Sequence, residues 1–297
     1  MMKRVLLFIV TNIAVMIALG VVANVLCALL GTTVAELVGP EWSSLLIYAF
    51  VYGMLGAFVS LLLSKPMAKM ACGARTIDGS EGEAERWLVS TVEDLARRAN
   101  LKTPEVAIYP GAANAFATGA FRDSALVAVS TDIMGLMSKE ELRAVLGHEM
   151  SHVANGDMVT LTLVQGVLNA FVIVISRVLA SVLSSAGQKG ESRRNNGGTY
   201  FLLVMILQMA FGVLASLVVF WFSRKREYAA DAGSAKLLGT PSAMIAALRR
   251  LGNLQPGVLP DSLKAMGIVE GRKTSIWSTH PSIDDRITAL QNLSASI

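Results

Sequence analysis

The 297-residue chain is strongly apolar, with 53% hydrophobic residues, 16% charged residues and a mean hydropathy of +0.54. Soluble globular proteins carry roughly 25% charged residues, so a purely soluble globule is disfavoured. The net charge of +4 is modest and no basic run alternates with aromatic residues, so no nucleic-acid partner is indicated.

The charged residues are unevenly distributed along the chain. Of the 26 basic and 22 acidic residues, only nine lie within 1–64 and 158–223. The remainder of the chain has the charge density of an ordinary soluble protein. We therefore expect a soluble-type domain that is interrupted and tethered by membrane segments. Cys27 and Cys72 lie in or next to apolar runs, and we expect both to be free thiols.

Four stretches are long and apolar enough to cross a bilayer, which takes about 20 helical residues. The first, 5–35, is interpreted as an uncleaved anchor because its apolar run is long and another span follows it. The other three predicted spans cover residues 42–64, 158–183 and 199–222.

The basic residues around these spans predict an orientation. Lys3 and Arg4 precede the first span and Lys65 follows the second, so the positive-inside rule places the segment from 65 onward in the cytosol. Three basic residues between the third and fourth spans argue against an external loop there: Lys189, Arg193 and Arg194. It stays open at this point whether the last two spans cross fully.

Outside the spans, the pattern predicts an α+β fold that is mainly helical. Apolar residues at helical spacing predict a helix over 81–100. A capping box at residues 138–141 opens another helix, and Asn155-Gly156 supplies its stop. The other predicted elements are two short strands and a further helix: 104–109, 124–129 and 240–252.

Two of the three histidines stand four residues apart in His148-Glu149-Met150-Ser151-His152. On a helix, such residues lie one above the other on one face, so both imidazoles can bind one metal ion. Glu149 lies beside the first of them and can reach a metal-bound water without being a ligand. Chance gives this pattern in on the order of one such chain in a thousand. The pattern predicts a catalytic zinc site with Glu149 as general base.

A catalytic zinc usually has a third protein ligand. The position of a third metzincin histidine is Met158, which leaves Glu227 and His280 as candidates. Glu227 and Asp231 share one face of a helical pattern, which suits a ligand and a carboxylate that accepts the other N–H of a ligand histidine. The same acids would also balance the basic residues 224–226 on a solvated helix, so spacing alone leaves the third ligand open.

The segment 146–157 resembles the active-site helix of the HtpX family of bacterial membrane-bound heat-shock metalloproteases. Three further stretches match that family in the same order, at residues 114–119, 226–231 and 279–281. The resemblance covers nearly the whole chain, and the polar loop 184–199 matches poorly. The larger family also includes the CAAX prenyl proteases.

The resemblance implies a zincin-like fold of the gluzincin type, with a cytosolic protease domain and four membrane helices. It implies one Zn²⁺ per chain, with Glu227 as the third ligand beside His148 and His152. It also implies that Asp231 orients a ligand histidine, and that His280 lies near the site and assists the substrate or the transition state.

Two assignments rest on thinner signals. Asn114, Ala115 and Phe116 lie between two predicted strands, where a substrate peptide could add along an edge through main-chain hydrogen bonds. An ordinary loop stabilised by Asn and Gly is the alternative for this stretch. By the resemblance, His280 is a candidate donor to the oxyanion, whereas a lone histidine is more often an ordinary loop residue.

These features predict a membrane-integral zinc endopeptidase that cuts misfolded or damaged membrane proteins and unfolded polypeptides. The resemblance implies a multi-pass protein of the bacterial inner membrane, with its site facing the cytosol and a functional link to other membrane quality-control proteases. A CAAX-type processing peptidase is the alternative, although four spans are few for a large enclosed chamber. A scaffold with structural zinc is disfavoured, because such sites are closed mostly by Cys and His.

We expect four parts along the chain. Residues 1–64 form a two-helix transmembrane region, and 65–157 form the first part of the metalloprotease domain. Residues 158–223 form a hydrophobic hairpin of two spans, and 224–297 complete the metalloprotease domain with the third ligand. Because residues 152 and 227 must meet at one ion, the hairpin must leave and return to the same side of the membrane.

Overall fold

A computed structural model describes residues 42–186, 197–253 and 278–294, together with a few separate positions between 17 and 33. The predicted span 5–35 lies almost wholly outside the described residues, as do Cys27 and most of the polar loop 184–199. The chain divides into two compact units, which we describe separately. The helical unit comprises Met1–Val59 and Thr162–Val219, and the sheet unit comprises Ser60–Leu161 and Phe220–Ile297.

Within the described residues, three helices are long and apolar enough to cross a membrane, which confirms three of the predicted spans. One of them continues well past the apolar stretch that predicts it. The predicted span 199–222 and the charged segment that follows it form a single helix, so Glu227 stands on the same helix as the span. The three helices are α3 (Trp42–Cys72), α7 (Asp157–Ala186) and α8 (Gly197–Leu238).

Small residues line the interior of the helical unit. Gly53 of α3 packs so closely against α7 that an added Cβ would lie 2.7 Å from the backbone nitrogen of Ala170. Large apolar side chains point outward instead, among them Phe201 (64% exposed) and Met209 (69% exposed). This distribution suits a bilayer, where lipid tails solvate apolar side chains and helices associate through small residues.

The sheet unit contains a four-stranded mixed sheet with the order β1-β2-β4-β3. The pairs β1–β2 and β3–β4 are antiparallel, and the central pair β2–β4 is parallel. The two predicted strands are confirmed as β2 and β4. The other two were not predicted, and β3 occupies the stretch for which a loop was the alternative. The strands are β1 (Arg75–Ile77), β2 (Glu105–Tyr109), β3 (Ala115–Thr118) and β4 (Leu126–Ser130).

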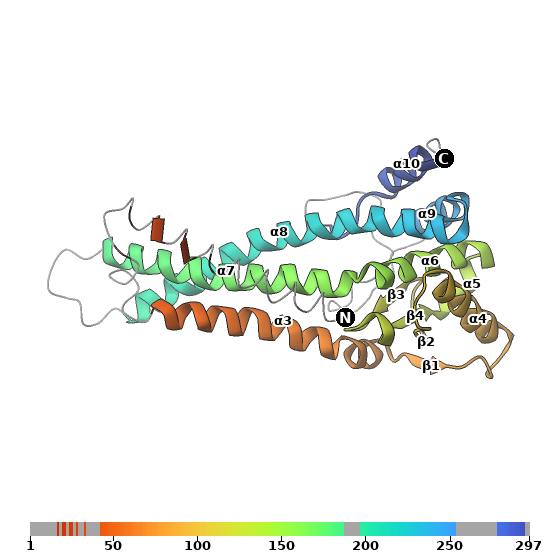
Figure 1. Cartoon of the computed structure of the whole chain (residues 1–297), viewed down its shortest axis with the longest axis horizontal. Coiled ribbons are helices and arrows are strands. Elements are labelled where there is room, and N and C mark those ends of the chain that lie inside the picture. Colours follow the sequence, from red (N-terminus) through yellow and green to blue (C-terminus); the bar gives the residue numbers. More distant parts are fainter. Residues whose placement is uncertain are drawn as a thin grey trace. The chain divides into compact units, whose positions relative to one another are not determined.

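Helices cover one face of this sheet and enclose the main core (Figure 1). The predicted capping box at Ser138 is confirmed, since its side chain and that of Glu141 bond to each other's backbone N–H. Gly156 ends that helix in the left-handed conformation, at φ 70°, as glycine allows. The helices are α4 (Glu83–Arg98), α5 (Thr131–Leu136), α6 (Lys139–Asn155), α9 (Ser242–Asn253) and α10 (Ile283–Ser294).

The observed class is therefore mainly helical α+β, as predicted. Helix α6 contacts β3, α4 and α9, and it carries the histidine motif through the middle of the core. Cys72, at the end of α3, is a free thiol, as expected.

Candidate metal centre

In the second half of α6, every residue from Gly147 to Val153 is buried. His148, Glu149 and His152 are only 1%, 2% and 6% exposed. The four-residue spacing places the two histidine rings on one helix face, with their centroids 4.7 Å apart. A polar cluster buried so deeply must satisfy its charges and hydrogen bonds internally.

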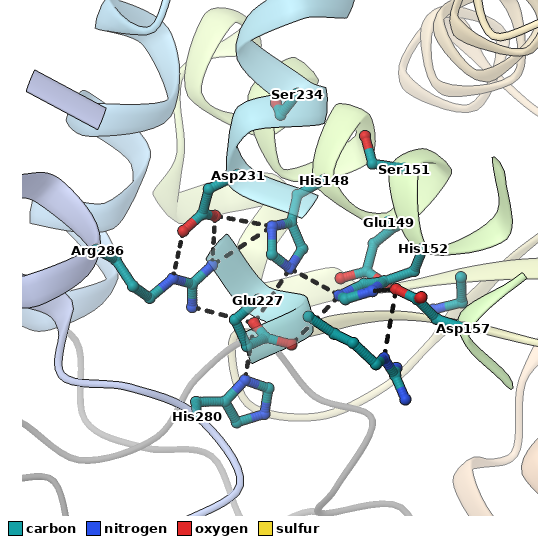
Figure 2. A network of polar contacts seen from close by, with 12 residues as sticks. His148, Glu149, Ser151, His152, Asp157, Glu227, Asp231, Ser234, His280 and Arg286 are labelled. Carbon is teal, nitrogen blue, oxygen red and sulfur yellow. Dashed lines mark hydrogen bonds and ion pairs between the residues drawn. The ribbon is translucent and has the colours of Figure 1, made fainter. Parts of the chain in front are cut away.

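Helix α8 reaches this face because small residues meet where it crosses α6. An added Cβ on Gly233 would lie 2.8 Å from Ser151 Cβ, and one on Gly147 would lie 2.8 Å from Ser234 Oγ. Each glycine thus leaves room for a serine of the other helix, and Figure 2 shows both serines near the crossing. This close approach brings Glu227 of α8 to the two histidines.

Glu227 and the two histidines present their ligand atoms to one point. The Nε2 atoms of His148 and His152 are 3.1 Å apart. Glu227 Oε2 lies 3.3 Å from the first nitrogen and Glu227 Oε1 lies 3.3 Å from the second. Two nitrogens bound to one tetrahedral zinc are separated by about 3.3 Å, so the spacing fits that ion.

Each ligand histidine has its own aspartate. Asp231 Oδ1 lies 2.9 Å from His148 Nδ1, and Asp157 Oδ2 lies 2.5 Å from His152 Nδ1. A carboxylate at Nδ1 keeps the proton on that nitrogen and turns the lone pair of Nε2 toward the metal position. The expected role of Asp231 therefore has a matching geometry, and Asp157 does the same for the other ring.

Each of these aspartates faces an arginine, but the two arginines are held differently. Arg286 of α10 donates to both oxygens of Asp231, at 2.8 and 2.6 Å. Arg226 Nε lies 3.4 Å from Asp157 Oδ2, too far for a strong hydrogen bond. Figure 2 shows Arg286 and Asp157 on opposite sides of Glu227.

The cluster contains four buried carboxylates and two arginines, so its net charge is −2 when all four carboxyl groups are ionised. Arg286 and Arg226 supply two positive charges, and the histidines are neutral when they act as ligands. One divalent cation would balance the cluster, which fits the converging donor atoms of His148, His152 and Glu227. The residues present therefore fit a zinc ion. The four buried carboxylates are those of Glu149, Asp157, Glu227 and Asp231.

Glu149 lies beside the ligands and bonds to the sheet. Its Oε2 accepts a hydrogen bond of 2.8 Å from the backbone N–H of Ala117 on β3. Burial raises the pKa of Glu149, against the opposing effect of the two neighbouring histidines. A carboxylate with a raised pKa, held next to a metal position, has the properties of a general base.

The other predicted site residues lie close by. His280, which precedes α10, has its Nδ1 2.9 Å from Glu227 Oε2. Asn114 caps the start of β3, where its Oδ1 accepts the N–H of Ala115 at 2.8 Å. Phe116 packs its ring against Tyr109, with the ring centroids 5.6 Å apart. Asn114, Ala115 and Phe116 are at most 1% exposed: Ala115 packs in the main core with α6, whereas the Phe116 ring lies in a second apolar cluster with Tyr109.

Three residues of this cluster were not predicted from the sequence. Asp157 follows His152 at a spacing that matches no helical periodicity, because α6 ends between them. Arg286 is 55 residues from Asp231, and Arg226, although it lies in the family-like stretch 226–231, was given no role at the site. The acidic residue directly after Asn155-Gly156 was the available signal for Asp157.

Comparisons with known proteins show the family of this chain. The family profile described as "Peptidase family M48" matches residues 83–294. A protein named "Protease HtpX homolog" from Verminephrobacter eiseniae is 51% identical over 98% of this chain and 99% of its own length. A relative with the same description from Neisseria meningitidis serogroup C is 52% identical over 98% of this chain and its own full length. The crystal structure of S. mikatae Ste24p resembles this fold with a TM-score of 0.55 at 18% identity, covering 95% of this chain and 66% of that one.

Proposed function

The chain belongs to peptidase family M48, as a membrane zinc metallopeptidase of the HtpX type, and we propose that it hydrolyses peptide bonds of misfolded or damaged membrane proteins. One observation carries the chemistry: His148, His152 and Glu227 converge with Glu149 at their side. The quality-control role is supported by the membrane spans and by the resemblance to bacterial heat-shock proteases.

Glu149 is the proposed general base. His148, His152 and Glu227 would hold a zinc ion, which would supply a Lewis acid for the scissile carbonyl and lower the pKa of water to about 7. Glu149 takes the proton from the attacking water and later delivers it to the leaving amine. The hydrogen bond from Ala117 N–H holds one carboxylate oxygen, which fixes the orientation of the other toward the reacting groups.

We assign His280 as a second stabiliser of the developing oxyanion. It lies against Glu227, and its own side chain is only 6% exposed. Loss of one such donor typically lowers kcat by about 10²–10³-fold. His280→Ala should therefore lose activity while it retains zinc. Full activity with unchanged substrate affinity would remove His280 from the mechanism.

The substrate is proposed to bind along the outer edge of β3. Ser130 N–H donates to Asn114 C=O at 2.9 Å, so the alternation of an antiparallel pair turns the backbone groups of Ala115 and Ala117 to the outer side. Their N–H groups already bond to Asn114 and Glu149, which leaves the two carbonyls to accept N–H groups of a peptide. Phe116 would support this edge from behind. Because β3 is buried, peptide binding requires the edge to open.

The four-part division expected from the sequence remains our proposal for the organisation of the chain. Along the chain, the boundaries between the compact units fall after residues 59, 161 and 219, within a few positions of the expected boundaries at 64, 157 and 223. The basic residues near the ends of the spans support a cytosolic metal centre in a multi-pass protein of the bacterial inner membrane.

The test uses the full chain, purified in detergent, and an unfolded model protein as substrate. Wild type should cleave it, lose activity on chelation and recover with zinc. Glu149→Gln should lose about 10²–10⁴-fold in rate and still bind zinc. Glu140→Gln, at an exposed position on the same helix, should behave as wild type.

Further substrates separate the alternatives. Faster cleavage of a misfolded than of a folded membrane protein in vesicles would support the quality-control role. Cleavage of a farnesylated CAAX peptide alone would favour a dedicated processing peptidase. Stoichiometric zinc with no cleavage of any substrate would instead indicate a structural metal.

A further inference from the structure

Arg286 is a fully buried charge that no part of the proposed mechanism uses. Its side chain is 1% exposed, although it lies on a helix near the end of the chain. Its guanidinium bonds to Asp231 through two nitrogens, Nε to Oδ2 at 2.8 Å and Nη2 to Oδ1 at 2.6 Å. The third nitrogen, Nη1, lies 3.4 Å from Glu227 Oε2. One side chain thus contacts a zinc ligand and the aspartate behind another ligand (Figure 2).

We propose that Arg286 is a positioning residue of the metal centre, and that α10 completes the zinc site through it. Arg286 fixes Asp231, which in turn fixes the ring of His148, and it also restrains the carboxylate of Glu227. The proposal deepens the proposed function and rests on it only for the zinc site. It does not depend on which polypeptides are cut.

The geometry explains why an arginine is needed at this position. A guanidinium presents parallel N–H donors that match both oxygens of a carboxylate, whereas a lysine ammonium is a single point charge. Arg226 cannot replace it, because its Nε lies 3.4 Å from Asp157 on the other side of Glu227. Without Arg286, Asp231 and Glu227 would retain buried negative charge with one positive partner fewer, which is costly in a water-poor interior.

The position of Arg286 in the chain adds a consequence. The two histidines come from α6 and Glu227 comes from α8, but Arg286 comes from the last described helix. High-affinity zinc binding then requires that α10 has packed on α9, where Arg286 reaches Asp231 and Glu227 of α8. An incomplete chain would carry all three ligands and still hold zinc poorly.

The experiment measures zinc affinity by chelator competition on the full chain in detergent, together with the Tm of the metal-free protein. Arg286→Ala should weaken zinc binding by about 10–100-fold. Arg286→Lys should recover part of the loss, because it restores the charge without the paired hydrogen bonds. Leu290→Ala is the matched control: this side chain is 2% exposed, lies one turn further along α10 and packs in the core away from the metal.

A double-mutant cycle tests the route through Asp231. If Arg286 acts mainly through this residue, Arg286→Ala should weaken zinc binding much less in the Asp231→Ala background than in wild type, the remainder reflecting its contact with Glu227. The proposal is overturned if Arg286→Ala weakens zinc binding no more than Leu290→Ala at an equal loss of Tm. It is also overturned if the two losses in the cycle are additive. Neither readout uses peptide cleavage, so failure of this proposal is distinguishable from failure of the proposed function.

Discussion

The two compact units differ in what they add to an apolar interior. In the helical unit the interior holds small residues such as Ala49 and Ala170, and Met209 points outward at 69% exposure. In the sheet unit an apolar core of large side chains also encloses charges such as Asp231 and Arg286, which are 2% and 1% exposed. The helical unit is organised for a surrounding of lipid tails, and the sheet unit is organised around an internal cation.

This contrast shows that the side chains that are stable when buried or exposed depend on whether lipid or water surrounds that part of the chain. Next to lipid, a large apolar side chain is stable on the outside, and helices pack through small residues. Next to water, a buried charge is tolerated only with partners, and the sheet unit supplies them around its metal centre. The following variants place the same kind of change in both units or test one side of the contrast.

The largest expected effect comes from a lysine on the outside of α8. Met209→Lys should impair membrane insertion by about 3 kcal/mol, because lysine is costly at the centre of a span. Leu136→Lys, at a 48% exposed position of the sheet unit, should change stability by less than about 0.5 kcal/mol. Resistance to alkaline extraction from membranes and the Tm measure the two effects. Equal behaviour of the two variants would contradict the contrast.

The next effect concerns the crossing of α6 and α8. Gly233→Ala should destabilise the sheet unit by about 1–3 kcal/mol, because the new Cβ would lie 2.8 Å from Ser151 Cβ. Adding Ser151→Gly should restore most of the lost stability, because it removes the side chain on α6 that the new Cβ on α8 would meet. Thermal unfolding of the two variants measures this compensation. A double variant as unstable as the single one would mean that the close approach does not limit the packing.

The loss of Asp157 should weaken the metal centre without unfolding it. Asp157→Ala removes the carboxylate that orients His152 and should reduce zinc affinity by about 10–100-fold. Asp284→Ala, on the exposed side of α10, is the control and should leave zinc affinity unchanged. Chelator competition measures both variants. An unchanged affinity in Asp157→Ala would show that the ring of His152 is held by its other neighbours.

The smallest effect is expected at a cluster of ion pairs between β2 and the end of α3. Glu105 lies 2.7 Å from Lys65 Nζ and 2.6 Å from Lys69 Nζ, and these hydrogen bonds hold the pKa of Glu105 below its usual value. A carboxyl group whose pKa is lower in the folded than in the unfolded state stabilises the fold at pH values above its unfolded-state pKa. This stabilisation is lost as the pH falls through the folded-state pKa. Glu105 is 43% exposed, so solvent screens the pairs.

Glu105→Gln should therefore cost less than about 1 kcal/mol at pH 7. The difference from wild type should shrink as the pH falls below about 4, where the native carboxyl also becomes neutral. Unfolding curves measured from pH 3 to pH 7 check this. A difference that stayed constant with pH would point to packing rather than charge.

The sequence predicts those parts of the molecule that depend on local periodicity. The four-residue step from His148 to His152 identifies the metal site, and long apolar runs identify the spans. The strand β3 was missed because a four-residue run, Ala115–Thr118, is too short to separate from a loop. Its identity comes from pairing with β4, which no local pattern records.

The residues around the ligands were harder to predict, for a related reason. Asp231 was found because it shares a helix face with Glu227. Arg286 contacts Asp231 only through the tertiary fold, so its position gives no periodic signal. The extent of α8 was predicted only in part. The sequence changes from apolar to charged after residue 222, which suggested a boundary, but the helix continues to Leu238.

The junction between α6 and α7 has a consequence for the allowed length of the chain. Helix α6 ends at Asn155, Gly156 adopts its left-handed conformation, and α7 begins at Asp157, whose carboxylate bonds to His152. Exposed connections ordinarily accept insertions and deletions. This one is a spacer of fixed length, since each added residue would carry the carboxylate away from the imidazole. The five-residue step from His152 to Asp157 is therefore fixed. We expect insertions and deletions among active forms of this protein to lie elsewhere in the chain.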